Sequence, residues 1–340
     1  MSSDDPIAPL VGAFTDAAAH RGFGEAWFEF AGRPVRLRTV GDELSAKMTE
    51  PFSHLHCEPT TEPRLTIDVW DERATGIALP TSASVSPGAA GLVEDRRHAG
   101  VVWRVGDGLA RALDRESGRI IGWCRDAAIL PSEERTKPLR HLLDTWYLDR
   151  HVPVIHAAAV AADGRGALVA GPSGIGKSTT ALACAAAGLD LAGDDEVGLE
   201  ETTAGAFRVH SLYSVARVER EHLRAHPWLA CGESPVHQVG DKSLVFAGRA
   251  PAVRWARSMP VAAILVPARD GGPGLRPASG AAVLRALAPS TLIGPVGGGR
   301  WTLERLARLA AAAPAFFFCA PLEPSAVAAL VREALARAVS

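Results

Sequence analysis

Cysteine is sparse in this sequence, and its placement excludes the frameworks that cysteines usually build. The chain of 340 residues contains five cysteines, which are widely spaced and form no C-x-x-C pair. An odd number at such spacings supplies neither a disulfide scaffold nor a structural zinc site. We therefore expect reduced thiols and a cytoplasmic protein.

An excess of charge is also missing, as are long apolar runs. The formal net charge is -2 at pH 7 and the basic residues are scattered, so nothing favours nucleic acid or a membrane surface as a partner. No stretch reaches the roughly 18 apolar residues that a membrane helix needs. The acidic start Met1–Pro6 lacks the basic and apolar regions of a secretory signal. The composition is typical of a soluble globular protein.

Two domains are expected from the length of the chain. In residues 1–135, apolar and polar side chains alternate in short runs separated by Gly, Pro and Asp, which is typical of a half-buried antiparallel sheet. The clearest runs are residues 27–30, 35–38, 65–70 and 101–105. No catalytic motif occurs there, so we predict a β-rich accessory or substrate-recognition domain.

Residues 136–340 mix helical and strand patterns, which predicts an α/β (α+β mixed) catalytic domain. Buried strands are expected at 154–160 and 167–170, and a helix over Ser178–Ala187 should end at Gly188, which suits the left-handed position after a helix. Further strands are expected near 209–218, 243–246 and 261–267, and further helices near 138–150, 221–229, 301–312 and 325–339.

The most informative motif is a glycine-rich segment that matches G-x-x-x-x-G-K-[ST] between an expected strand and an expected helix. Its glycines let the backbone curl so that successive N–H groups point at phosphate oxygens. Lys177 adds a cation at the β/γ end of a nucleoside triphosphate, and the Ser178 hydroxyl can bind Mg²⁺. The predicted nucleotide-binding residues are Gly171, Pro172, Ser173, Gly174, Ile175, Gly176, Lys177, Ser178 and Thr179.

An acidic pair, Asp194–Asp195, follows the next expected strand. Such a pair also suits a turn or a helix cap. If its strand lies beside the strand of the glycine-rich segment, one carboxylate can bind Mg²⁺ and the other can accept a proton. Neighbouring side chains of an extended chain point in opposite directions, so we expect different roles for the two. His156, on the preceding strand, either reaches the same site or is a core histidine.

The run from His156 through Gly171–Ser178 to Gly193–Asp195 resembles the catalytic core of HPr kinase/phosphorylase and related serine kinases. The family has a histidine, a G-x-S-G-x-G-K-S loop and an A-D-D pair at the same spacings. The segment Leu287–Leu292 also resembles these kinases, and the likeness covers roughly residues 136–338. It implies a fold like that of phosphoenolpyruvate carboxykinase, a mixed sheet carrying the loop, and the use of ATP and Mg²⁺.

The resemblance also implies roles for individual residues. Lys177 would hold the β- and γ-phosphates, Ser178 would bind Mg²⁺ and His156 would line the active site. Asp195 matches the general base of the family, which deprotonates a serine hydroxyl. Asp194 is its neighbour in the family pair, and we expect both carboxylates to contribute to the metal site.

Three departures from the family pattern concern the reverse reaction and the substrate. Thr179 replaces a glutamate after the loop serine, the downstream E-[IV]-R-G signature is absent, and no clear arginine-bearing loop follows. They weaken the expectation of phosphorylase activity and of HPr as the substrate. Other candidates for contact with phosphate or substrate are Arg217, Arg254, Arg257, His210, Tyr213 and Lys242.

These features predict an ATP- and Mg²⁺-dependent kinase that phosphorylates a serine of a protein or peptide. Two alternatives stay open. The acceptor could instead be a small alcohol or an amino acid, or the chain could be a nucleotide-sensing protein that transfers nothing and binds a partner through its β-rich half. A homo-oligomer is compatible with the resemblance, because hexamers occur in the family.

Overall fold

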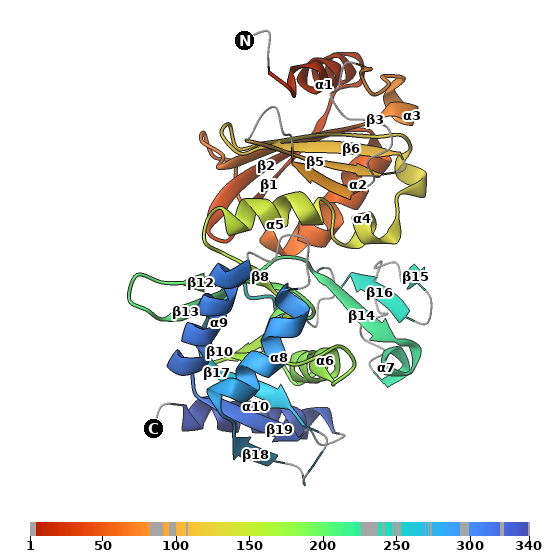
Figure 1. The fold of residues 1–340 in the computed structure, drawn as a ribbon. Coiled ribbons are helices and arrows are strands. Elements are labelled where there is room, and N and C mark those ends of the chain that lie inside the picture. The colour runs from red at the N-terminus through yellow and green to blue at the C-terminus, as the bar shows by residue number, and fades with distance from the viewer. Residues whose placement is uncertain are drawn as a thin grey trace. The chain divides into compact units, whose positions relative to one another are not determined.

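The computed structural model describes residues 5–81, 91–94, 100–106, 108–225, 237–239, 242–246, 248, 253–268, 270, 272, 274–292, 299–319 and 323–338. The chain divides into two compact units, Met1–Trp146 and Tyr147–Ser340 (Figure 1). The predicted boundary after residue 135 precedes this division, which falls within helix α5 (Arg140–Leu148). Among the helices of the described residues, none combines the length and the apolar character needed to cross a membrane.

The first unit is built on a seven-stranded sheet with the order β1-β2-β3-β7-β6-β5-β4. Its strands are β1 (Gly24–Phe30), β2 (Arg33–Val40), β3 (Leu65–Asp71), β4 (Gly91–Glu94), β5 (Val101–Gly106), β6 (Leu109–Asp114) and β7 (Arg119–Cys124). Neighbouring strands are antiparallel, except that β3 is parallel to both β2 and β7. The prediction of an antiparallel sheet is therefore wrong at its centre.

The central strands are buried on both faces, as parallel strands usually are. Parallel neighbours also need a crossover connection, and α2 (Asp42–Thr49) with the short helix η1 (Glu50–Leu55) joins β2 to β3. Helix α1 (Ala8–Arg21) packs on β2, β3 and β7 and contributes Leu10 and Phe14 to a core cluster that includes Trp70. The remaining short helices of the unit are α3 (Glu72–Thr75), η2 (Ala127–Ile129) and α4 (Ser132–Thr136).

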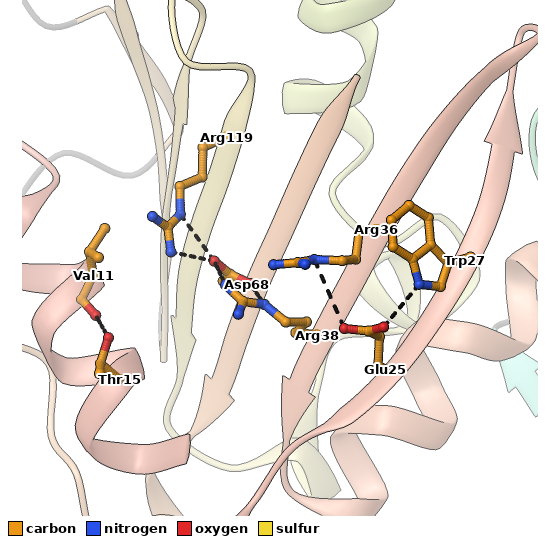
Figure 2. Close-up of polar contacts among 8 residues, drawn as sticks. All are labelled: Val11, Thr15, Glu25, Trp27, Arg36, Arg38, Asp68 and Arg119. Atoms are coloured by element: carbon orange, nitrogen blue, oxygen red, sulfur yellow. Dashed lines mark hydrogen bonds and ion pairs between the residues drawn. The ribbon is translucent and has the colours of Figure 1, made fainter. Parts of the chain in front are cut away.

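A buried carboxylate binds two arginines across these central strands (Figure 2). Asp68 of β3 has an exposed fraction of 0%, and its two oxygens accept from Nε and Nη2 of Arg38 at 2.7 and 2.8 Å. Nε and Nη2 of Arg119 donate to the same carboxylate at 3.0 and 2.5 Å. The Arg38 guanidinium also lies 5.2 Å from the ring centre of Phe14. Asp68 thus ties β2, β3 and β7 together beneath α1.

The second unit contains a nine-stranded mixed sheet with the order β11-β9-β10-β17-β13-β12-β8, in which β19 pairs with β17 and β18. Its strands are β8 (Val154–Ile155), β9 (Ala157–Ala162), β10 (Arg165–Ala170), β11 (Asp190–Gly193), β12 (Val197–Glu201), β13 (Phe207–Ser211), β17 (Ser258–Pro267), β18 (Gly274–Pro277) and β19 (Ala315–Cys319). A separate sheet contains β14 (Val215–Glu219), β15 (His237–Val239) and β16 (Lys242–Phe246), next to α7 (Arg220–Ala225).

Helices cover the large sheet on both faces (Figure 1). Side chains of α6 (Lys177–Ala186) and α10 (Pro324–Arg337) belong to one core cluster, and those of α8 (Gly280–Leu292) and α9 (Gly299–Ala312) belong to another. Mixed strands between two helical layers confirm the predicted α/β class with a mixed sheet.

Two cysteines are buried in the interiors of the units. Burial raises the pKa of the Cys124 thiol and of the Cys184 thiol to about 12, and the nearby Asp71 carboxylate adds to the effect at Cys124. We expect neither thiol to react with iodoacetamide in the native protein near pH 8, whereas the partly exposed Cys57 and Cys319 should react. Peptide mass spectrometry after alkylation measures this, and rapid native labelling of Cys184 would contradict the described burial.

The same shifts predict a loss of stability at alkaline pH. Each thiol keeps its proton in the folded state to a higher pH than in the unfolded state, so the unfolded chain loses protons first. The contribution of the two thiols is therefore complete below about pH 9 and decreases as the pH rises toward 12. Urea unfolding at several alkaline pH values should show a weaker decrease for Cys184→Ala than for the native sequence.

Candidate active site

A long antiparallel strand pair is interrupted at the predicted acidic pair. Gly193 at the end of β11 lies opposite Ala159 of β9, and Val197 at the start of β12 lies opposite Ile155 of β8. These two pairs share one register, whereas Asp190 and Leu191 pair with β9 one residue out of that register. The antiparallel ladder is therefore irregular before Gly193 and interrupted between Gly193 and Val197. The gap contains the three acidic residues that join β11 to β12, which are Asp194, Asp195 and Glu196. On the opposite chain, His156 joins β8 to β9.

The glycine-rich segment lies between a strand and a helix, as predicted. It follows β10 and ends where α6 begins at Lys177. Gly174 and Gly176 have φ angles of 79° and 112°, which other residues adopt only with strain. Residues 172–174 are exposed. Helix α6 ends at Ala186, and Gly188 takes the expected left-handed position two residues later, with its N–H donating to the Ala185 carbonyl at 3.0 Å. The segment therefore presents backbone at a helix N-terminus, a position that favours anions.

Lys177 folds back over this loop. Its side chain is buried, with 6% of the residue exposed, and Nζ donates to the carbonyl oxygens of Gly171 at 2.7 Å and Pro172 at 3.1 Å. A phosphate bound at the loop would offer Nζ a charged acceptor in place of these neutral carbonyls, which is the stronger interaction.

The loop and the gap in the ladder lie at the same edge of the sheet. Ala170, the last residue of β10, pairs with Ala157, the first residue of β9. Gly171 follows Ala170 and His156 precedes Ala157, so both leave the sheet at this edge. The expectation that the aspartate strand borders the loop strand directly is wrong, because β9 lies between β11 and β10. The groups converge because β9 carries His156 at its end.

His156 and Asp195 form a side-chain pair in the gap. His156 Nδ1 lies 3.1 Å from Asp195 Oδ1, and each side chain is 23% exposed. Asp194 is buried, with 3% exposed. The two aspartates thus occupy different environments, but they lie in a bend between β11 and β12 and not in an extended strand, so the alternation expected for them does not apply. A carboxylate on Nδ1 fixes the orientation of the imidazole ring.

The predicted metal site consists of oxygen donors. Ser178 and Thr179, in the first turn of α6, are partly buried. Within the described part of the chain, no group of three or more His, Cys, Asp or Glu side chains is arranged to hold a metal ion. A hydroxyl and carboxylates are the donor types that Mg²⁺ takes, since it keeps several waters and binds one or two carboxylates together with substrate phosphates.

Sequence reasoning assigned no role to Thr291, which contacts the site. The backbone N–H of His156 donates to Thr291 Oγ1 at 3.4 Å, and Thr291 lies in the last turn of α8. The only sequence signal was the likeness of Leu287–Leu292 to related kinases, and it gave no indication of which residue matters.

Two of the other candidates have partners of their own. Arg254 Nε lies 2.8 Å from Asp190 Oδ1, and Arg254 also donates to the Gly188 carbonyl. Asp190 begins β11, so this arginine is at the end of the strand opposite to the acidic pair. His210 of β13 lies 2.8 Å from the Glu200 carboxylate of β12. The structure therefore places Arg254 away from the loop.

The remaining candidates are Arg257, Tyr213, Arg217 and Lys242. Arg257 is exposed and its carbonyl accepts from the Ser211 N–H at 2.9 Å. Tyr213 is buried, with 5% exposed. The side chains of Arg217 and Lys242 lie outside the described residues.

Comparisons with known proteins give little further information. No protein-family model and no curated protein sequence matches the chain. Among solved structures, it is similar to the Hpr(Ser) kinase/phosphatase from Coxiella burnetii, with 14% sequence identity and a TM-score of 0.32 over 55% of this chain and 99% of that chain. This is a distant structural relationship.

The contacts of Lys177 predict a loss of nucleotide affinity on its removal. In Lys177→Met the apolar stem remains but the cation is absent, so Mg·ATP should bind about tenfold more weakly. Isothermal titration calorimetry measures the change. Lys47→Met, which removes an ammonium bound to Glu43 and to the Ala127 carbonyl, controls for the loss of one positive charge. Equal affinity in Lys177→Met and the native protein would contradict a role in phosphate binding.

Proposed function

We propose that this chain is an ATP- and Mg²⁺-dependent kinase that transfers the γ-phosphoryl group to a serine hydroxyl of a protein or peptide. The observation that carries the proposal is the 3.1 Å contact of His156 Nδ1 with Asp195 Oδ1, at the edge of the sheet where the glycine-rich loop begins. A phosphate-binding loop alone supports nucleotide binding. The adjacent imidazole and carboxylate add a group that can accept a proton.

The loop residues 171–176 and Lys177 would bind the nucleotide. Backbone N–H groups at the start of α6 favour negative charge, because the first N–H groups of a helix have no partner within it. Lys177 would exchange its two carbonyl acceptors for phosphate oxygens. The exposed residues 172–174 leave this part of the loop accessible to a ligand.

Asp195 would act as the proton acceptor. The serine oxygen forms a bond to the γ-phosphorus while the bond from that phosphorus to the bridging oxygen of ADP breaks, and the hydroxyl proton passes to the Asp195 carboxylate. His156, in contact with the same carboxylate, would hold it in the orientation that faces the acceptor. Because both side chains are 23% exposed, the pair is accessible from solvent.

Ser178 and the two aspartates would supply oxygen ligands for Mg²⁺. When bound, the ion offsets the charge of the phosphates. Asp194 is buried beside the loop edge and Asp195 is partly exposed, so the former is the better fixed ligand and the latter the better proton acceptor. In this division Asp194 would serve the metal alone, and Asp195 would combine a metal contact with proton transfer.

A macromolecular acceptor is favoured by the separate first unit. It has its own sheet and its own core cluster, and the sequence has no catalytic motif there. A whole domain without chemistry is suited to recognition of a protein or peptide. Recognition of a small alcohol needs only a few polar groups in a pocket.

Labelled ATP tests the proposal directly. The full chain is incubated with [γ-³²P]ATP and Mg²⁺, in one arm with a degenerate serine peptide library and in another with a metabolite mixture that contains no peptide. We expect label on peptide serine and none without Mg²⁺. Label found only on metabolites would indicate a small-molecule acceptor in place of a peptide serine. Stabilisation by Mg·ATP without transfer in either arm would indicate a nucleotide sensor.

A further inference from the structure

One contact links the imidazole of the site to a distant part of the chain. Thr291 is buried, with 6% exposed, and its Oγ1 accepts the backbone N–H of His156 at 3.4 Å across 135 positions of sequence. Its helix, α8, packs against β8, β10 and β17. The hydroxyl is therefore carried by an element that is itself fixed on the sheet.

His156 falls between two paired segments. Before it, Ile155 pairs with Val197 of β12, and after it, Ala157 pairs with Ala170 of β10. His156 lies between β8 and β9, where the ladder with β11 and β12 is interrupted. The hydrogen bond from its N–H to Thr291 restricts rotation of the backbone there, and the side chain turns with the backbone.

We propose that Thr291 is a positioning residue that fixes the His156 backbone and, through it, the contact of the imidazole with Asp195. The inference rests on the proposed function, in which Asp195 accepts the acceptor proton. Thr291 touches neither nucleotide nor acceptor in this account. Its hydroxyl sets the position of the ring, and small displacements of a reacting group reduce transfer rates strongly.

A set of three variants tests the role. Thr291→Val keeps the branched shape and removes the acceptor, and we expect transfer to fall about tenfold with nucleotide affinity unchanged. Thr291→Ser keeps the hydroxyl and should restore most of the rate. Thr302→Val is the matched control, because Thr302 is a fully buried threonine of α9 whose hydroxyl has no hydrogen-bond partner among the described residues. It should leave the rate unchanged.

A double-mutant cycle separates positioning from general damage. If Thr291 acts through His156, the tenfold effect of Thr291→Val should disappear in a His156→Gln background, because contacting residues are not additive. The same tenfold loss in that background would overturn the proposal. An equal loss of rate in Thr291→Ser and Thr291→Val would also overturn it, since the hydroxyl would then be irrelevant.

An independent readout covers the case in which the chain transfers no phosphate. In protein labelled with ¹⁵N-histidine, the Nδ1 resonance of His156, assigned from His156→Gln, reports its hydrogen bond. Thr291→Val should shift this resonance, and Thr291→Ser and Thr302→Val should not. An unshifted resonance in a folded Thr291→Val protein would refute the positioning role, whereas failure of the kinase assay alone would refute only the proposed function.

Discussion

Asp195→Asn is expected to bind Mg·ATP with nearly native affinity and to transfer phosphate about 100-fold more slowly or worse. The amide has almost the shape of the carboxylate but cannot accept a proton at neutral pH. It also weakens the contact with His156 Nδ1, now 3.1 Å from the carboxylate oxygen. Binding depends on the loop and Lys177, which the substitution leaves in place. Calorimetry for affinity and single-turnover transfer for rate separate the two effects.

Asp190→Asn is the matched control for this prediction. Asp190 begins β11, the strand that leads to Asp195, and pairs with Arg254 at 2.8 Å. Its replacement changes the net charge by the same amount, and transfer should stay within about twofold of native, since surface ion pairs contribute little. Native transfer by Asp195→Asn would remove the carboxylate from the mechanism.

The second large effect concerns the stability of the first unit. Asp68→Asn is expected to lower its free energy of unfolding by about 3 kcal/mol, because removal of one partner from a buried ion pair leaves the remaining charges uncompensated. Arg38 and Arg119 both depend on this carboxylate, and their side chains are 20% and 26% exposed. Water can hydrate the two partly exposed guanidinium groups, so we expect a loss of free energy at the lower end of the range for breaking a buried ion pair. Hydrogen exchange of the amides in β2, β3 and β7 of the full chain reports the change.

Glu25→Gln is the control on the same sheet (Figure 2). Glu25 lies 3.9 Å from Arg36 and accepts from the Trp27 indole at 2.9 Å, with side chains that are 38% and 31% exposed for Glu25 and Arg36. An exposed pair of this kind contributes roughly 0.5 kcal/mol or less. Equal destabilisation by both variants would show that burial of Asp68 does not govern its contribution.

The local parts of the site could be predicted from the sequence. The loop with its flanking strand and helix follows from one motif and from apolar patterning, and the helix end before Gly188 follows from the preference of glycine for the left-handed position, where its φ is 81°. The acidic pair lies directly after a strand, as the apolar pattern indicated, although its two residues form a bend and not extended chain. These features depend on neighbours within a few residues, which the sequence displays directly.

The long-range parts could not be predicted. That β9 separates the aspartate strand from the loop strand depends on strand order, which no periodicity encodes. The contact of Thr291 with His156 spans 135 positions and gives no local pattern. The parallel centre of the first sheet was missed because alternation was taken as a sign of antiparallel pairing, although β3 and β7 are buried almost continuously.

The most direct test of the account is the structure of the full chain with Mg²⁺ and a non-hydrolysable ATP analogue. We predict that the terminal phosphate lies on the loop and accepts a hydrogen bond from Lys177 Nζ. The Asp195 carboxylate should remain in contact with His156 and lie no more than one water molecule away from the side of the terminal phosphate that the acceptor approaches. A nucleotide bound elsewhere, or a terminal phosphate that points away from the His156–Asp195 pair, would contradict the assignment.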